Sequence, residues 1–158
     1  MSFFIHGIFI GMFATLMMDI FAFIRFKFFH IASLNYRLVG RWMISWKDRK
    51  FKHHHILHSD VQKFEVLIGW IIHYIIGIIW AIIFLFLVQY FDIKLIFISS
   101  LTYALFTSLI PFIIMQPAFG LGFFASKTPN PKSNIFNSLM SHTAFGIGLY
   151  FSHQVLHL

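Results

Sequence analysis

Three ionisable residues stand inside long apolar stretches of the sequence: Asp19, His73 and His142. A carboxylate or an imidazole inside a hydrophobic span is costly unless it faces protein or water, so each is a candidate functional residue. One carboxylate and two imidazoles can bind a divalent metal in a site with open coordination positions. The same groups can pass a proton or hold a small solute within a carrier or channel. They can also join helices by hydrogen bonds, without any turnover.

Each of these residues belongs to a row of mostly small residues spaced four apart, which lie on one face of a helix. The rows are Gly7-Gly11-Thr15-Asp19, Gly69-His73-Gly77-Ala81 and Ser138-His142-Gly146. Small faces let membrane helices approach closely. At about 1.5 Å per residue, the three ionisable residues lie roughly 9–12 Å inside the same edge of their spans. We therefore predict a polar pocket near the inner mouth of a helix bundle, to which Thr15, Ser108 and Gln116 also contribute.

The chemistry of this pocket stays open at the level of the sequence. No HExxH, ExxH or paired-carboxylate motif is present, so we assign no catalytic residue and do not identify the chain as an enzyme. Proton or small-solute passage ranks above a metal-dependent membrane enzyme among the active functions. A metal site would use Asp19, His73 and His142, and a purely structural or assembly role is the third alternative.

Four apolar runs must position these residues, and each approaches or exceeds the roughly 20 residues that a membrane span requires. We place them at about 3–24, 66–90, 95–116 and 135–156. Of the 158 residues, 59% are hydrophobic and 11% are charged. In soluble domains, about a quarter of all residues are charged. The absence of cysteine excludes disulfides and thiolate metal sites. We expect an all-α, polytopic membrane four-helix bundle that forms a single domain over residues 1–158.

The basic residues are concentrated in the loop at 25–65, which holds nine of the twelve in the chain. They are Arg25, Lys27, Arg37, Arg41, Lys47, Arg49, Lys50, Lys52 and Lys63. The second loop has only Lys94, whereas the third has Lys127 and Lys132. The positive-inside rule then predicts that the first and third loops are cytoplasmic and that both termini lie outside. We expect the 25–65 loop to contact anionic lipid headgroups of the bilayer and not nucleic acid.

Within this loop, Leu38, Val39, Trp42 and Trp46 have near-helical spacing, which predicts a short helix at headgroup level. The tract His53–His55 follows, with His58 and Asp60 close behind. Imidazoles are common metal ligands, so a metal-binding tract is one interpretation. We favour a solvated, mobile basic segment, because a loop holds ligands in place poorly.

Several motifs along the chain resemble a known family. They are Ala14-Thr15-Leu16-Met17-Met18-Asp19, Ser33-Leu34-Asn35-Tyr36 with Val39-Gly40-Arg41-Trp42, Gly69-Trp70-Ile71-Ile72-His73-Tyr74, Met115-Gln116-Pro117-Ala118-Phe119-Gly120-Leu121-Gly122, Lys127-Thr128-Pro129-Asn130-Pro131, and His142 with Phe145-Gly146-Ile147-Gly148-Leu149-Tyr150. The chain thus resembles uncharacterised bacterial integral membrane proteins with four predicted spans, classed as a domain of unknown function. The resemblance implies a bacterial inner-membrane location, but it supplies no reaction, cofactor or binding residue. Four thin helices leave room for a homo-oligomer, although no residue selects one.

Overall fold

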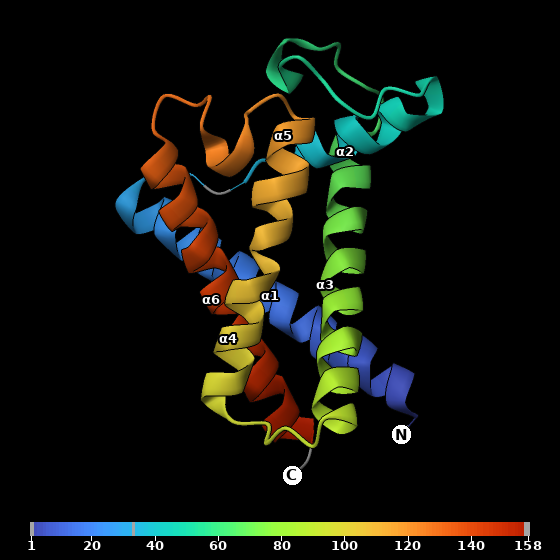
Figure 1. Cartoon of the computed structure of the whole chain (residues 1–158), viewed down its shortest axis with the longest axis vertical. Coiled ribbons are helices and arrows are strands. Elements are labelled where there is room, and N and C mark those ends of the chain that lie inside the picture. The colour runs from blue at the N-terminus through green and yellow to red at the C-terminus, as the bar shows by residue number, and fades with distance from the viewer. Residues whose placement is uncertain (1, 33, 157–158) are drawn as a thin grey trace. The chain divides into compact units, whose positions relative to one another are not determined.

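The computed structural model describes residues 2–32 and 34–156, and in these ranges it consists of helices and turns without a β-strand (Figure 1). The long helices are α1 (Phe3–Phe29), α3 (Glu65–Tyr90), α4 (Phe97–Thr107) and α6 (Pro131–Leu156). The shorter elements are α2 (Tyr36–Ser45), the π-helical turn η3 (Pro111–Met115), α5 (Gln116–Ala118) and the 3-10 turns η1 (Trp46–Asp48), η2 (Ile56–His58) and η4 (Phe123–Ala125). The predicted all-α fold is confirmed. Ser33, which is part of one motif of the resemblance, lies outside the described residues.

Three helices are long and apolar enough to cross a membrane: Phe3–Phe29, Glu65–Tyr90 and Phe97–Ala118. They correspond to the first three predicted runs. The fourth run, 135–156, is helical as part of α6, which has 26 residues. Its first half carries polar residues such as Asn134, Asn137 and Ser138, which lower its hydropathy. That α6 also crosses a membrane stays a prediction.

Helix α1 extends five residues beyond the predicted end at Ile24, because its basic residues do not terminate it. Lys27 lies in the last turn, where a positive charge is favourable beside the unpaired carbonyls of a helix end. The helix ends where His30 adopts a left-handed conformation (φ 54°). The His30 backbone N–H then donates to the carbonyls of Arg25 and Phe26, as in helix ends capped by a left-handed residue.

The third span is interrupted near Pro111. Proline has no backbone N–H and its ring clashes with the preceding turn, so a regular helix cannot pass through it. The chain leaves α4 at Thr107 and adopts the π-helical turn η3 before it enters α5. π-Helical turns are rare and occur frequently at functional sites.

The chain divides into two compact units. Unit 1 comprises Met1–Ser33, Tyr74–Thr107 and Leu139–Leu158, and unit 2 comprises Leu34–His73 and Ser108–Ser138. Unit 1 therefore contains α1, α4 and the C-terminal parts of α3 and α6. Unit 2 contains α2, the start of α3 and the segment from η3 to the start of α6.

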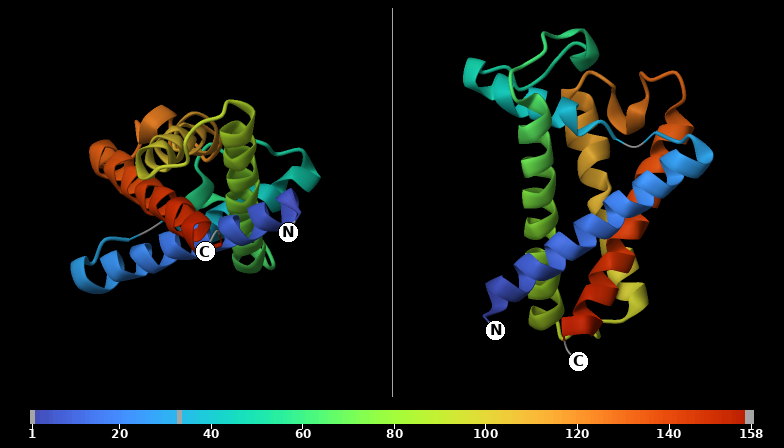
Figure 2. Two further views of the ribbon diagram at one scale, coloured as in Figure 1. Left: turned by 90° about the horizontal axis from the view of Figure 1, so that it is seen from below. Right: turned by 180° about the vertical axis from the view of Figure 1, so that it is seen from behind.

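In unit 1, α1 packs closely on α3 and α6 through glycines. A Cβ atom on Gly11 of α1 would lie 2.5 Å from the Cα atom of Ile78 on α3. A Cβ atom on Gly148 of α6 would lie 2.6 Å from the Cα atom of Ala14 on α1. Figure 2 shows α1 in blue and the C-terminal part of α6 in red, running in opposite directions. These backbones approach too closely for any larger residue at the glycine positions.

Helix α4 completes unit 1 by contacting α6 and α3. A Cβ atom on Gly146 of α6 would lie 2.8 Å from the Cβ atom of Ala104 on α4. The Tyr103 hydroxyl of α4 donates a hydrogen bond of 2.8 Å to the Trp80 carbonyl of α3. With the contacts of α1, these pairs connect four helical segments of unit 1 in a closed ring of neighbours.

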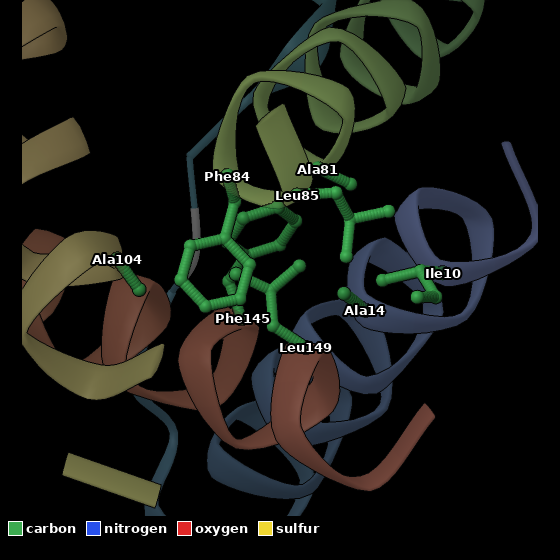
Figure 3. Packing of buried hydrophobic residues seen from close by; sticks show 8 residues of the cluster. All are labelled: Ile10, Ala14, Ala81, Phe84, Leu85, Ala104, Phe145 and Leu149. Carbon is green, nitrogen blue, oxygen red and sulfur yellow. The ribbon is translucent and has the colours of Figure 1, made fainter. Parts of the chain in front are cut away.

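The centre of unit 1 is an apolar cluster to which all four helical segments contribute (Figure 3). Its buried members are Ile10, Ala14, Ala81, Phe84, Leu85, Ala104, Phe145 and Leu149. Phe145 and Leu149 of α6 lie one turn apart and face Phe84 and Leu85 of α3 (Figure 3). Small alanines alternate with these larger side chains, which allows the helices to interlock at native packing density.

Unit 2 has a smaller core that fixes α2 against the loop and α5. Leu38 and Val39 of α2 pack with Ile56 and Phe119. The predicted short helix is present as α2, and the Asn35 side chain caps it by accepting the Arg37 backbone N–H at 3.2 Å.

Candidate functional site

The six predicted pocket residues fall in different units. Thr15, Asp19 and His142 belong to unit 1, whereas His73, Ser108 and Gln116 belong to unit 2. The predicted convergence of Asp19, His73 and His142 spans both units, so it stays a prediction. Within unit 1, the contacts of Asp19 and His142 define a candidate site.

Asp19 has a hydrogen-bonding partner on α3 in the Tyr74 hydroxyl. One turn earlier on α1, Thr15 is buried and its hydroxyl donates to the Gly11 carbonyl at 2.7 Å. The Thr15 hydroxyl lies directly against Gly77 of α3, where a Cβ atom would overlap it. Because Gly77 and Tyr74 are separated by one turn of α3, the same helix contact that seats Thr15 brings Asp19 to Tyr74.

His142 is held by the buried Thr107 of α4. The His142 Nδ1 atom lies 2.8 Å from Thr107 Oγ1, and the Thr107 hydroxyl donates to the Ala104 carbonyl at 2.6 Å. A hydroxyl has a single hydrogen, so when Thr107 donates it to the Ala104 carbonyl, His142 Nδ1 is the donor in the other bond. In that tautomer Nε2 is the ring nitrogen with a lone pair.

Asp19 and His142 lie at similar heights in unit 1. Gly148 and Ala14 are in contact, and α1 and α6 are antiparallel (Figure 2). Asp19 is five residues beyond Ala14, and His142 is six residues before Gly148. At about 1.5 Å per residue, both are displaced in the same direction, by roughly 7.5 and 9 Å. We call Asp19, Tyr74, Thr107 and His142 the polar level of unit 1.

A second pair of ionisable groups lies further along the same helices. The His6 ring on α1 and the His153 ring on α6 have centroids 5.9 Å apart. His6 precedes Asp19 by thirteen residues, which corresponds to roughly 20 Å of helix. Ile10 and Ala14 of the apolar cluster lie between them on α1. Unit 1 thus has ionisable groups at two heights, and the residues of the apolar cluster, which are drawn in Figure 3, lie between them along α1.

In unit 2, His73 stacks on an aromatic ring of α2. The centroids of the His73 and Tyr36 rings are 3.9 Å apart with an interplanar angle of 21°, and the Trp70 ring contacts both. The backbones meet nearby, because a Cβ atom on Gly40 would overlap the Glu65 carbonyl and one on Gly69 the Tyr36 carbonyl. The small row that includes Gly69 and His73 therefore serves to dock α2 in this unit.

A buried charge network in unit 2 escaped the sequence reasoning. Glu65 and Arg41 are only 3% and 5% exposed. Arg41 Nε donates to Glu65 Oε2 at 2.8 Å, and its Nη2 atom donates to Oε1 at 3.1 Å. Arg37 also donates to Glu65, and so does the Gln62 backbone N–H. The hydrogen bonds to Glu65 raise the pKa of Arg41, against the opposing effect of burial. The network fixes the start of α3 to α2.

The two remaining predicted residues lie near the π-helical turn of unit 2. Ser108 is buried three residues before its start at Pro111, and Gln116 begins α5 immediately after it. In the described part of the chain, no three histidine, aspartate or glutamate side chains are grouped in a way that could hold a metal ion. The divalent-metal alternative thus gains no support from these residues and stays a prediction.

Tyr74 and Thr107 are the members of the polar level that the sequence reasoning missed as site residues. The sequence contains a signal for Tyr74. It lies one turn before Gly77, and Gly77 belongs to the row of small residues that predicts a helix contact. Thr107 is one of several hydroxyl residues in its span, and its pairing with His142 requires knowledge that α4 and α6 are neighbours.

Residues 8–156 match a family model described as a protein of unknown function (DUF2938). Neither the curated proteins nor the solved structures include a match to the chain.

Proposed function

Because the chain belongs to the DUF2938 family of proteins of unknown function, we propose its activity from the geometry of unit 1: passage of protons, or of a small solute coupled to them, across a bacterial inner membrane. One observation carries this proposal: ionisable residues lie at two heights along the helices of unit 1, on either side of an apolar layer. His6 and His153 lie at one height, and Asp19 and His142 lie at the other. Ionisable residues inside a membrane bundle commonly mark proton or ion pathways.

The proposed location rests on the three membrane-length helices and on the resemblance to bacterial membrane proteins. The chain is multi-pass, with the 25–65 loop in the cytoplasm and both termini on the outer side, as the basic residues indicate. In this orientation the polar level lies toward the cytoplasm, and His6 and His153 lie toward the outside.

In the proposed mechanism, Asp19 and His142 bind and release the proton. The Tyr74 hydroxyl stabilises the Asp19 carboxylate by a hydrogen bond, and Thr107 orients His142 so that Nε2 can accept a proton. The apolar layer blocks water between the two heights, because apolar side chains at close packing leave no room for it. Protons can pass only when this layer opens. In the resting state the layer is closed, which prevents a proton leak.

The test is a proton-flux assay in proteoliposomes that contain a pH-sensitive dye, with a potassium gradient and valinomycin as the driving force. Asp19→Asn removes the ionisable carboxyl but keeps its shape, so we expect flux to fall to the level of protein-free vesicles. Asp92→Asn is the matched control, because Asp92 is exposed in the loop between α3 and α4 with a left-handed φ of 49° that asparagine tolerates. Equal flux through both variants would refute the proposal.

A structural or assembly role is the second candidate, and specific hydrogen bonds favour it. Thr15, Thr107 and Ser152 donate to carbonyls of their own helices, and Thr107–His142 joins two neighbouring helices. Such bonds commonly serve packing in membrane bundles. This role predicts that Asp19→Asn lowers the melting temperature while wild-type protein shows no flux above that of protein-free vesicles.

The metal-dependent enzyme remains a separate alternative, with Asp19, His73 and His142 as ligands. Elemental analysis of purified wild-type protein and of His73→Ala decides it, because metal bound equally by both would exclude this site.

We further propose that the 25–65 loop contacts anionic lipid headgroups. In unit 2, Lys47, Arg49, Lys50 and Lys52 are exposed, and so is the aromatic ring of Phe51, at 57%. Basic residues beside a membrane span attract the negative surface of the cytoplasmic leaflet.

A further inference from the structure

The histidine tract of unit 2 has a fixed backbone, in contrast to the mobile segment that the sequence suggested. The His53 N–H donates to the Ala118 carbonyl at 2.8 Å, and the Ile56 N–H donates to the Phe119 carbonyl at 2.9 Å. Ile56 and Phe119 are fully buried. The tract is therefore paired directly with the segment that follows α5.

Two side chains of α2 hold the ends of the tract. The Trp42 indole N–H donates to the Phe51 carbonyl at 2.7 Å. Arg41 donates from one guanidinium nitrogen to the carbonyls of Ile56 and Ser59, each at 3.0 Å. Because Arg41 is itself fixed by Glu65, the loop is anchored to a rigid element. Preorganisation of this kind is the property that a loop usually lacks as a binding site.

A further close approach of the two segments occurs at Gly120. Its φ of +80° is readily adopted only by glycine, and a Cβ atom there would overlap the His54 carbonyl. The two backbone segments thus lie against each other without an intervening side chain, which fixes the position of the tract relative to Gln116.

Three buried polar atoms in these paired segments have no hydrogen-bond partner within the described residues: His53 Nε2, His55 Nδ1 and Gln116 Oε1. Burying such atoms without a partner costs free energy, so native proteins nearly always satisfy them with protein, water or ligand. The oxygen and nitrogen of a glutamine amide can exchange places by a flip, so Gln116 can present either an acceptor or a donor. The adjacent His54, in contrast, is exposed.

The local charge selects the class of ligand that fits these atoms. Imidazoles can give lone pairs to a metal cation or N–H groups to an anion. Burial and the positive charges of Lys50 and Arg41 lower the pKa of His53. The two positive charges, unlike burial, also bear on the ligand, because they repel a cation and attract an anion at His53. Lys52, exposed one residue before His53, adds to it.

We propose that His53, His55 and Gln116 form a binding site for a phosphate-class anion, either free phosphate or the phosphate of a lipid headgroup. His53 Nε2, His55 Nδ1 and the Gln116 amide nitrogen donate hydrogen bonds to its oxygens, and Lys50 supplies charge. Hydrogen bonds between charged and polar partners of this kind are about twice as strong as neutral ones. The inference rests on the proposed anionic partner of the 25–65 loop, and it is independent of passage through unit 1.

The test compares His53→Ala with His54→Ala, which removes an exposed imidazole from the same tract. The probes are inorganic phosphate, added to protein in a zwitterionic detergent, and nanodiscs of phosphatidylglycerol or phosphatidylcholine. Intrinsic tryptophan fluorescence reports binding, because Trp42 holds Phe51 and contacts the Phe119 ring. We expect wild type and His54→Ala to respond to phosphate or phosphatidylglycerol, and His53→Ala to bind at least about tenfold more weakly.

The outcomes separate the sources of the anion. A response to inorganic phosphate alone assigns a free anion, whereas a response to phosphatidylglycerol alone assigns a lipid headgroup. Equal binding by His53→Ala, which indicates surface lysines only, overturns the proposal. A response to neither inorganic phosphate nor phosphatidylglycerol also overturns it. If His53→Ala does not fold, Gln116→Met provides the same comparison. Failure here leaves the Asp19→Asn flux result unaffected, so the two proposals can fail separately.

Discussion

Glu65→Gln is expected to destabilise unit 2 by about 3–5 kcal/mol, the usual cost of leaving a buried charge without its partner. Glu65 accepts hydrogen bonds from Arg41 and Arg37 and from the Gln62 backbone, and its side chain is 3% exposed. The substitution removes the negative charge, but Arg41 stays charged at any accessible pH. Its guanidinium remains buried at 6% side-chain exposure, where water cannot replace the carboxylate.

Tryptophan fluorescence measures this effect, because Trp42, Trp46 and Trp70 lie in unit 2 and a Trp80→Phe background removes the fourth. Denaturant titration in detergent should show an earlier midpoint for Glu65→Gln. Asp60→Asn is the control, since Asp60 is exposed and acts on Arg41 only through its charge at a distance. Its free energy of unfolding should change by less than about 1 kcal/mol.

The double variant Arg41→Met/Glu65→Leu distinguishes charge burial from simple loss of contacts. Well-packed apolar residues often replace a buried ion pair at little cost, because the desolvation penalty of both charges disappears. We expect the double variant to recover most of the stability that Glu65→Gln loses. A double variant as unstable as the single one would show that the hydrogen bonds of Arg41 to the Ile56 and Ser59 carbonyls dominate instead.

The helices could be predicted because their signal is local. The apolar run at 66–90 predicted the start and end of α3 to within one residue. The rows of small residues identified the helix faces that make contacts. Gly7 and Gly11 do contact α3, and Gly146 does contact α4. A row, however, does not reveal its partner. Gly69 docks α2, whereas Gly77 two turns later meets Thr15 of α1.

The pairings across long sequence separations could not be predicted. Arg41 and Glu65 are 24 residues apart. Charged residues in a loop are expected at the protein surface, so the sequence predicts an exposed position for both. Likewise, nothing local to His53 indicates that Ala118 will accept its N–H. Both pairings depend on α2 folding back onto the start of α3, which is set by the contact of Gly40 with Glu65.

The second large effect is expected at Gly11, where alanine should destabilise unit 1 by about 1–3 kcal/mol, the usual cost of overpacking. The new methyl group would lie 2.5 Å from the Ile78 Cα atom and 3.1 Å from the Gly77 carbonyl oxygen. These are backbone atoms, which cannot move without displacing α3 from α1. The gain in intrinsic helix propensity, at most about 1 kcal/mol, offsets only part of this cost.

Gly7→Ala is the matched control on the same face of α1, one turn earlier against the same partner helix. Its methyl group would meet the Ile82 Cγ1 atom at 2.5 Å, and the Ile82 backbone only at 3.5 Å. A side-chain atom can move away by rotation, so we expect Gly7→Ala to cost less than about 1 kcal/mol or to be neutral. Denaturant titration followed by circular dichroism compares the two variants. Equal costs at both positions would contradict the direct backbone contact of α1 with α3, and with it the helix register that brings Asp19 to Tyr74.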